Sequence, residues 1–208
     1  MDEREIIRIF SSALGISCLD DVAAVRIPGG NRKPPPLLLL VFKADMLVGS
    51  TDVPAQMEPW QGARKSVVSC ASDLAAKGAA PVAAMISLGL PSAGISREYV
   101  EGLARGFRMA SEEFGVKIVG GDTNEANDLV IDCSMIGVVK GGARMPARSG
   151  ARPGDAVVVS GKFGYPACGL AVLLGKASAP EPAGKGRRFV KQAVGSVLEP
   201  RPRQKFGT

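Results

Sequence analysis

Strand-length apolar segments alternate with long amphipathic helical patterns over roughly the first 155 residues of this 208-residue chain. This alternation predicts a mixed α/β or α+β domain, because helices between strands pack on the sheet that those strands form. The expected strands are 22–27, 37–44, 82–90, 116–119, 129–139 and 156–160. Helices are expected at 2–15, 60–77 and 96–114, with further helical patterns at 168–174 and 189–198.

Polar residues and glycines mark the ends of the first three expected helices. Asp2 is expected to cap the first helix, with Glu5 as its capping-box partner, and Gly15 to end it. Gly78 closes the second helix, and Ser96 caps the third. The proline-rich segment 28–36 cannot hold regular structure and predicts a loop.

Charge and composition narrow the classes of partner. The chain has 26 Lys and Arg against 20 Asp and Glu, a net charge of +6, which favours anionic partners. It has one Trp and two Tyr and no basic block interleaved with aromatic residues, so no nucleic-acid surface is expected. The longest apolar run, 37–42, is far too short to cross a bilayer, and the charged residues 2–5 predict no signal peptide.

The cysteines and the missing histidines limit the chemistry. No C-x-x-C pair occurs, and the four cysteines are far apart, at Cys18, Cys70, Cys133 and Cys168. This spacing argues against a zinc site or a disulfide framework and favours a reducing, cytoplasmic compartment. Because the sequence has no histidine, Ser-His and Cys-His catalysis is excluded. Chemistry must therefore use carboxylates, hydroxyls, lysines, arginines or bound ions.

The segment 118–124 combines an apolar strand pattern with two glycines and a carboxylate. Gly120 and Gly121 would let the backbone turn and let an anion approach it closely. Asp122 would repel a phosphate unless a cation lay between them, so it is interpreted as a magnesium ligand facing a nucleotide. An ordinary Gly-Gly-Asp turn is the alternative.

Three other carboxylate positions are candidates for the same site, each with a simpler interpretation. Asp45 follows an apolar strand, where site ligands collect, but a polar residue can also simply end a strand. Asp73 lies on an expected helix and could instead form an i,i+4 ion pair with Lys77. Asp20 and Asp21 precede a strand and could form only an Asx turn.

The usual phosphate-binding loops are missing from the sequence. Residues 169–176 approximate a P-loop, but the spacing between the glycines is wrong and no G-x-G-x-x-G occurs. Phosphates would therefore be held by magnesium ions, by the backbone amides of Gly120 and Gly121, and by arginines such as Arg144 and Arg148.

Five motifs in order across residues 19–155 resemble thiamine-monophosphate kinase of the archaeal style. They are LDDVAAV (19–25), ADMLV (44–48), SDLAAKG (72–78), VGGDTN (119–124) and RSGARPGD (148–155). That family belongs to the aminoimidazole-ribotide synthetase-like ATP-binding superfamily. The resemblance implies transfer of the ATP γ-phosphoryl group to thiamine monophosphate, which gives thiamine diphosphate. Positioning and metal ions would carry the catalysis, so no catalytic side chain is assigned.

The resemblance also implies a set of site residues and an assembly. The implied magnesium ligands are Asp21, Asp45, Asp73 and Asp122. ATP contacts fall on Gly121, Asp122 and Arg148, and the substrate contact falls on Asp52. Family members pair their N-terminal sheets, and the expected strands are more apolar than a half-covered sheet needs, so a homodimer is expected.

The implied fold is an aminoimidazole-ribotide synthetase N-terminal-like domain, a mixed sheet covered by helices, over residues 1–145. Residues 146–208 would begin a second, incomplete domain, since family members continue further. The chain departs from the family at Lys43 and Ala44, where Ser or Thr is usual, and at Cys70, where Asn is usual. Two alternatives stay open: another ATP-using enzyme of the superfamily, such as a selenophosphate synthetase-like one, or a non-catalytic ATP-binding or dimer-scaffold fragment.

Overall fold

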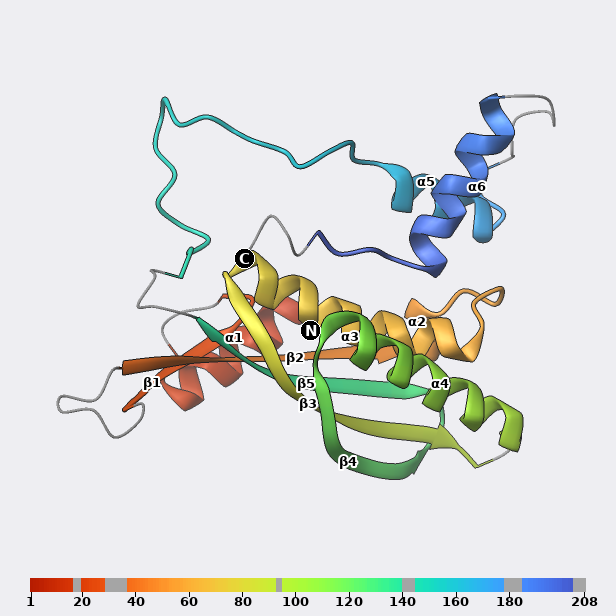
Figure 1. Cartoon of the computed structure of the whole chain (residues 1–208), viewed down its shortest axis with the longest axis horizontal. Helices are drawn as coiled ribbons and strands as arrows, with labels where there is room; N and C mark the ends of the chain where they lie inside the picture. Colours follow the sequence, from red (N-terminus) through yellow and green to blue (C-terminus); the bar gives the residue numbers. More distant parts are fainter. Residues whose placement is uncertain (17–19, 29–36, 93–94, 140–144, 178–184, 204–208) are drawn as a thin grey trace.

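The computed structural model describes residues 1–16, 20–28, 37–92, 95–139, 145–177 and 185–203. Five strands form one sheet in the order β1-β2-β5-β3-β4, and α3 and α4 pack on one of its faces (Figure 1). The elements in chain order are α1 (Glu3–Leu14), β1 (Ala23–Pro28), β2 (Leu37–Val48), α2 (Gly49–Asp52), α3 (Pro59–Ala76), β3 (Ala79–Pro91), α4 (Arg97–Phe114), β4 (Lys117–Ala126), β5 (Val130–Val139), α5 (Tyr165–Leu173) and α6 (Lys185–Leu198).

The sheet is mixed, which confirms the expected fold class. β2 pairs antiparallel with β1 and with β5, and β3 pairs antiparallel with β5. β4 is the one parallel strand of the described sheet, hydrogen-bonded to β3 along its edge. A parallel neighbour needs a crossover connection, and α4 supplies it between β3 and β4.

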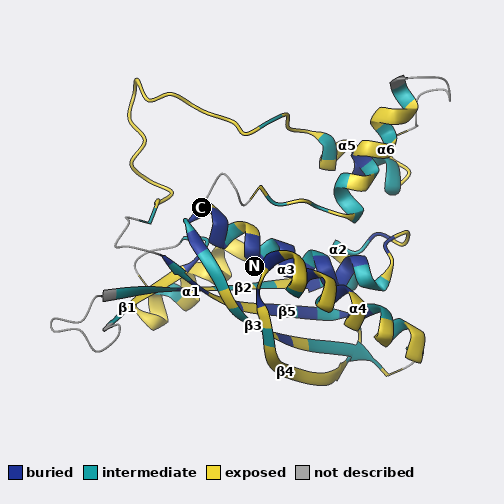
Figure 2. Cartoon of the chain, in the orientation of Figure 1, coloured by how far each residue is buried: buried dark blue, intermediate teal, exposed yellow. Residues whose placement is uncertain are grey.

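One face of the sheet forms the core and the other is open. Alternate residues of β2, β3 and β5 point at α3, and the buried ones include Val41, Ile86, Ile131, Cys133 and Met135. They pack against a buried stripe of α3 (Figure 2), whose members are Val67, Cys70, Ala71 and Leu74. The opposite face exposes large apolar side chains, which are Val25, Phe42, Met46, Met85, Val119 and Ile136.

The helix ends follow local sequence, as expected. The Asp2 carboxylate accepts the Glu5 backbone N–H at 2.8 Å, and Gly15 ends α1 in the left-handed conformation with φ 66°. At α4 the Ser96 hydroxyl accepts the Tyr99 N–H at 3.2 Å. The two helical patterns near the C-terminal end are also confirmed, as α5 and α6, which pack on each other.

Three strand predictions were wrong, because the local sequence does not show which strands pair with one another. Residues 156–160 form no strand: Val157 and Val158 are 94% and 86% exposed, and no described strand lies alongside to bond their backbone. β2 does not stop at residue 44 but continues to Val48, because β5 pairs with it over that length. β4 does not stop at residue 119, since the segment 120–126 pairs with β3 instead of turning. The predicted loop at 28–36 lies almost wholly outside the described residues.

Among the described helices, none combines the length and the apolar character needed to cross a membrane.

Candidate functional site

Three of the four predicted metal ligands gather at one edge of the α3–sheet interface. Lys43 and Asp45 are two residues apart on β2, so their side chains leave the same face of the sheet, toward α3. Asp73 lies near the C-terminal end of α3, and Asp21 lies just before β1. In this arrangement each of these carboxylates is within ion-pair distance of a lysine or an arginine.

Lys43 joins two of the carboxylates. Its Nζ is 2.8 Å from Asp73 Oδ2 and 3.8 Å from Asp45 Oδ2, and its side chain is 14% exposed. Burial disfavours the charged form of this amine. The hydrogen bond to Asp73 and the charge of Asp45 outweigh that cost and raise the pKa of Lys43 above its usual 10.5. Lys43 therefore stays an ammonium at neutral pH.

A second group of ion pairs holds the segment before β1 to α3. The Lys77 side chain is 5% exposed, and its Nζ lies 2.6 Å from Asp20 Oδ1 and donates to the Pro146 carbonyl at 3.1 Å. Arg148 donates to both carboxylate oxygens of Asp21. The bond from Lys77 lowers the pKa of Asp20, and the bond from Arg148 lowers the pKa of Asp21. The predicted nucleotide contact Arg148 is thus paired with a predicted metal ligand.

Asp122 does not lie beside the other three carboxylates in this structure. Asp45 lies in a cross-strand row with Cys133 on β5, Ile86 on β3 and Gly121 on β4. Asp122 lies one row along, and neighbouring rows face opposite sides of a sheet. Three strand spacings separate β2 from β4, roughly 14 Å. Asp122 is exposed at the far edge, on the open face.

The remaining predicted contacts have local structural roles. The Asp52 carboxylate accepts the Val48 backbone N–H at 2.8 Å and the Thr51 hydroxyl at 3.1 Å, which closes the turn between β2 and α2. Gly121 lies so close to β3 that an added Cβ would overlap the Ile86 carbonyl oxygen. Two residues considered from the sequence, Arg144 and Cys18, lie outside the described residues.

The carboxylates have the chemistry of a magnesium site but are held by the chain's own cations. Oxygen donors such as those of Asp21, Asp45 and Asp73 are what magnesium takes. Within the described part of the chain, however, no three His, Cys, Asp or Glu side chains converge closely enough to hold a metal ion. Lys43, Lys77 and Arg148 instead form ion pairs with these carboxylates.

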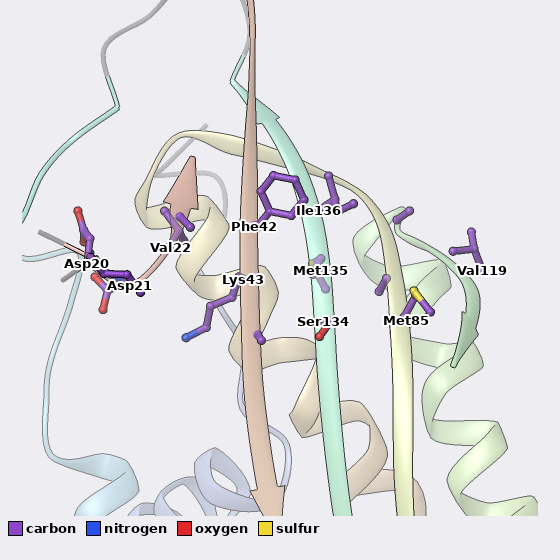
Figure 3. Close-up of a pocket in the computed structure, with 15 residues that line it drawn as sticks. Asp20, Asp21, Val22, Phe42, Lys43, Met85, Val119, Ser134, Met135 and Ile136 are labelled. Carbon is purple, nitrogen blue, oxygen red and sulfur yellow. Dashed lines mark hydrogen bonds between the residues drawn. The ribbon is translucent and has the colours of Figure 1, made fainter. Parts of the chain in front are cut away.

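A mostly apolar hollow of about 580 Å³ opens on the other face of the sheet. Phe42, Met85, Val119 and Ile136 line it, and Figure 3 shows them spread over β2, β5, β3 and β4. Asp20 and Asp21 lie at its rim, and in the same view the Lys43 side chain extends to their side of β2. The charged group and the apolar face therefore adjoin.

The sequence did not predict which carboxylates the basic members of this group pair with. Lys77 was considered only as a partner for Asp73, whereas it pairs with Asp20 and Asp21. Lys43 carried a usable signal, because a lysine in the middle of a long apolar strand needs a carboxylate partner. Nothing local in the sequence placed Arg148 beside Asp21, which is 127 residues away.

Comparisons with known proteins agree with one another. Residues 19–139 match the family described as "AIR synthase related protein, N-terminal domain". A Nitrosopumilus maritimus protein named thiamine-monophosphate kinase is 40% identical over all 208 residues, which cover 61% of its length. A Pyrococcus horikoshii protein of the same name is 36% identical, with 60% of its length covered. The chain thus spans about three fifths of these relatives.

Solved structures give the same result. The structure "AaThiL complexed with AMPPCP and TMP" superposes with a TM-score of 0.81 at 27% identity, covering 98% of this chain and 60% of that one. The thiamine monophosphate kinase of Aquifex aeolicus gives a TM-score of 0.79 at 26% identity, covering 99% and 64%.

Proposed function

We propose that this chain, which belongs to the AIR synthase related proteins, is the nucleotide-binding part of a thiamine-monophosphate kinase. The observation that carries the proposal is the 36–40% identity, over every residue of the chain, to two archaeal proteins of that name. The reaction is transfer of the ATP γ-phosphoryl group to the phosphate of thiamine monophosphate. The superposed AaThiL complex, which contains both AMPPCP and TMP, supports a nucleotide and a phosphorylated acceptor bound to one protein.

The proposed roles fall on two groups of residues. Asp21, Asp45 and Asp73 supply carboxylates for magnesium beside α3, and Gly121 and Asp122 contribute from β4. Bound magnesium would neutralise phosphate charge during transfer. Because the acceptor is already an anion, these residues need only position it, and a general base is not required. Asp52 is proposed to contact the acceptor through its place after β2.

Arg148 is proposed to contact the nucleotide, and for this it must leave Asp21. Its guanidinium is exposed, so it can turn without unpacking the core. Asp21 is one of the carboxylates that would hold magnesium, and a cation there would offset the negative charge that now holds Arg148. Arg148 would then be able to donate to a phosphate. Metal and nucleotide should therefore bind cooperatively.

A direct test is a phosphotransfer assay with labelled ATP and thiamine monophosphate, together with calorimetric titration of AMPPCP at fixed free magnesium. We expect Asp122→Asn to weaken AMPPCP binding about tenfold or more, as loss of a metal-site group does. Glu125→Gln, an exposed change on the same strand, should leave the affinity unchanged. Equal affinities for both variants would remove Asp122 from the site, and failure of the unaltered chain to bind AMPPCP would refute the proposal.

We further propose a homodimer formed through the open face of the sheet. Met85, which lines the hollow, is 52% exposed, and Met46 on the same face of the sheet is 61% exposed. Monomers rarely leave so large an apolar face uncovered. Light scattering should report a dimer at micromolar concentration, and Met85→Asp should shift it to a monomer. Met109→Asp, on an exposed part of α4, should leave the dimer intact, and a monomeric unaltered chain would contradict the proposal.

We also propose that a domain boundary lies between residues 145 and 146. The proposed location of the protein is the cytoplasm. The reducing compartment is supported by Cys70 and Cys133, which are free thiols in the core, and by the exposed free thiol of Cys168.

A further inference from the structure

Lys43 occupies a position that a metal ion would need. Its Nζ lies between two carboxylates, 2.8 Å from Asp73 Oδ2 and 3.8 Å from Asp45 Oδ2. Magnesium binds carboxylate oxygens at about 2.0–2.1 Å, so an ion shared by Asp45 and Asp73 would sit in the space that the ammonium fills. The Lys43 side chain is only 14% exposed and leaves the sheet on the side of α3, so its ammonium lies mostly among protein atoms.

The charge balance around Lys43 also disfavours a further divalent ion. The four carboxylates of Asp20, Asp21, Asp45 and Asp73 carry −4. Lys43, Lys77 and Arg148 carry +3 within ion-pair distance of them. The net charge of these seven groups is −1. With an uncharged residue at position 43 the net charge would be −2, and both negative charges would lie on Asp45 and Asp73.

We propose that the ammonium of Lys43 is a resident cation of the Asp45–Asp73 pair and takes the place of one divalent ion there. A covalently attached cation is present at every metal concentration, so one of the two negative charges of this pair is offset without magnesium. The chain then needs one divalent ion fewer than its carboxylates would otherwise bind. A phosphate brought to this point meets an ammonium donor in place of a metal ion. This inference rests on the proposed function only in identifying the anion as a nucleotide phosphate.

The test is manganese binding without nucleotide, counted from the free Mn²⁺ signal in electron paramagnetic resonance. Lys43→Met keeps the length of the side chain and removes its charge. We expect this variant to bind Mn²⁺ at least about tenfold more tightly at one site, because a like charge near the ion is gone. Lys43→Arg keeps the charge and should bind as the unaltered chain does. Lys117→Met removes an exposed charge from β4 and controls for net charge.

The gained site is located by a second change. Adding Asp73→Asn to Lys43→Met should abolish the tighter binding, because the freed carboxylate is then gone. If Lys43→Met folds poorly without metal, its melting temperature should rise with Mn²⁺ far more than that of the unaltered chain. Equal manganese affinity and equal thermal response in Lys43→Met and in the unaltered chain would overturn the inference. Failure to bind AMPPCP would overturn the proposed function and leave this result standing.

Discussion

Alanine at Gly121 will destabilise the chain by about 3 kcal/mol or more, whereas alanine at the adjacent Gly120 will cost almost nothing. A Cβ at Gly121 would overlap the Ile86 carbonyl oxygen, which is backbone of β3 and cannot turn aside. A Cβ at Gly120 meets nothing within 4 Å. Neither residue is among the glycines with positive φ, so backbone strain does not separate them.

Urea unfolding of both variants measures this difference. Gly121→Ala forces β4 away from β3, and β4 has no other strand partner in the described sheet, so the loss should include protection of the β4 amides. Gly120→Ala serves as the matched control, and removing a strand glycine should make it neutral or slightly stabilising. Equal midpoints for the two variants would show that β4 does not lie against β3 in the folded chain.

Replacing Arg64 by methionine is the second change with a large expected cost, about 2–3 kcal/mol of unfolding free energy. The guanidinium is almost fully buried and binds both oxygens of Glu113 on α4, at 2.8 and 2.9 Å. It also donates to the Pro200 carbonyl at 2.9 Å, which ties the segment after α6 to α3. Glu113 is 43% exposed and can recover water, which keeps the cost below that of a fully buried pair.

The exposed pair between Arg97 and Glu101 on α4 gives the control. Its side chains are 86% and 62% exposed, so Arg97→Met should change stability by no more than about 0.5 kcal/mol. Thermal or urea unfolding compares the two variants, and limited proteolysis after α6 reports release of the segment around Pro200. If Arg64→Met and Arg97→Met proved equally mild, Arg64 would not be the anchor that its contacts indicate.

The features that the sequence predicted correctly are helix ends, which depend only on residues within about one helical turn. The caps at Asp2 and Ser96 and the stop at Gly15 need only their neighbours, and all three were confirmed. The false strand at 156–160 shows the limit of that reasoning. Its valines have strand propensity, but a strand forms only where another supplies backbone partners. In the same way, nothing near Gly120 in the chain shows that β3 pairs with it in parallel.

The sequence predicted the carboxylates of the candidate site. It did not predict which lysines and which arginine pair with them. Family motifs pointed to Asp21, Asp45 and Asp73, which the fold does bring near one another. The neutralising partners come from remote segments, as with Arg148 on Asp21, and such pairing depends on tertiary structure. Asp122 was expected beside the others because a motif records order along the chain. It does not record which face of a sheet a residue occupies, and one step along a strand reverses that face.

Helix α1 has consequences for how the amino-terminal end of the chain behaves in solution. It is well capped at both ends, yet none of its twelve residues is buried, and Ile9 and Phe10 are 51% and 62% exposed. A helix of this length is only marginally stable in water without packing. Its amide hydrogens should therefore exchange almost as fast as those of a free peptide while the chain is alone. Slow amide exchange in α1 would show that another surface has covered its apolar side.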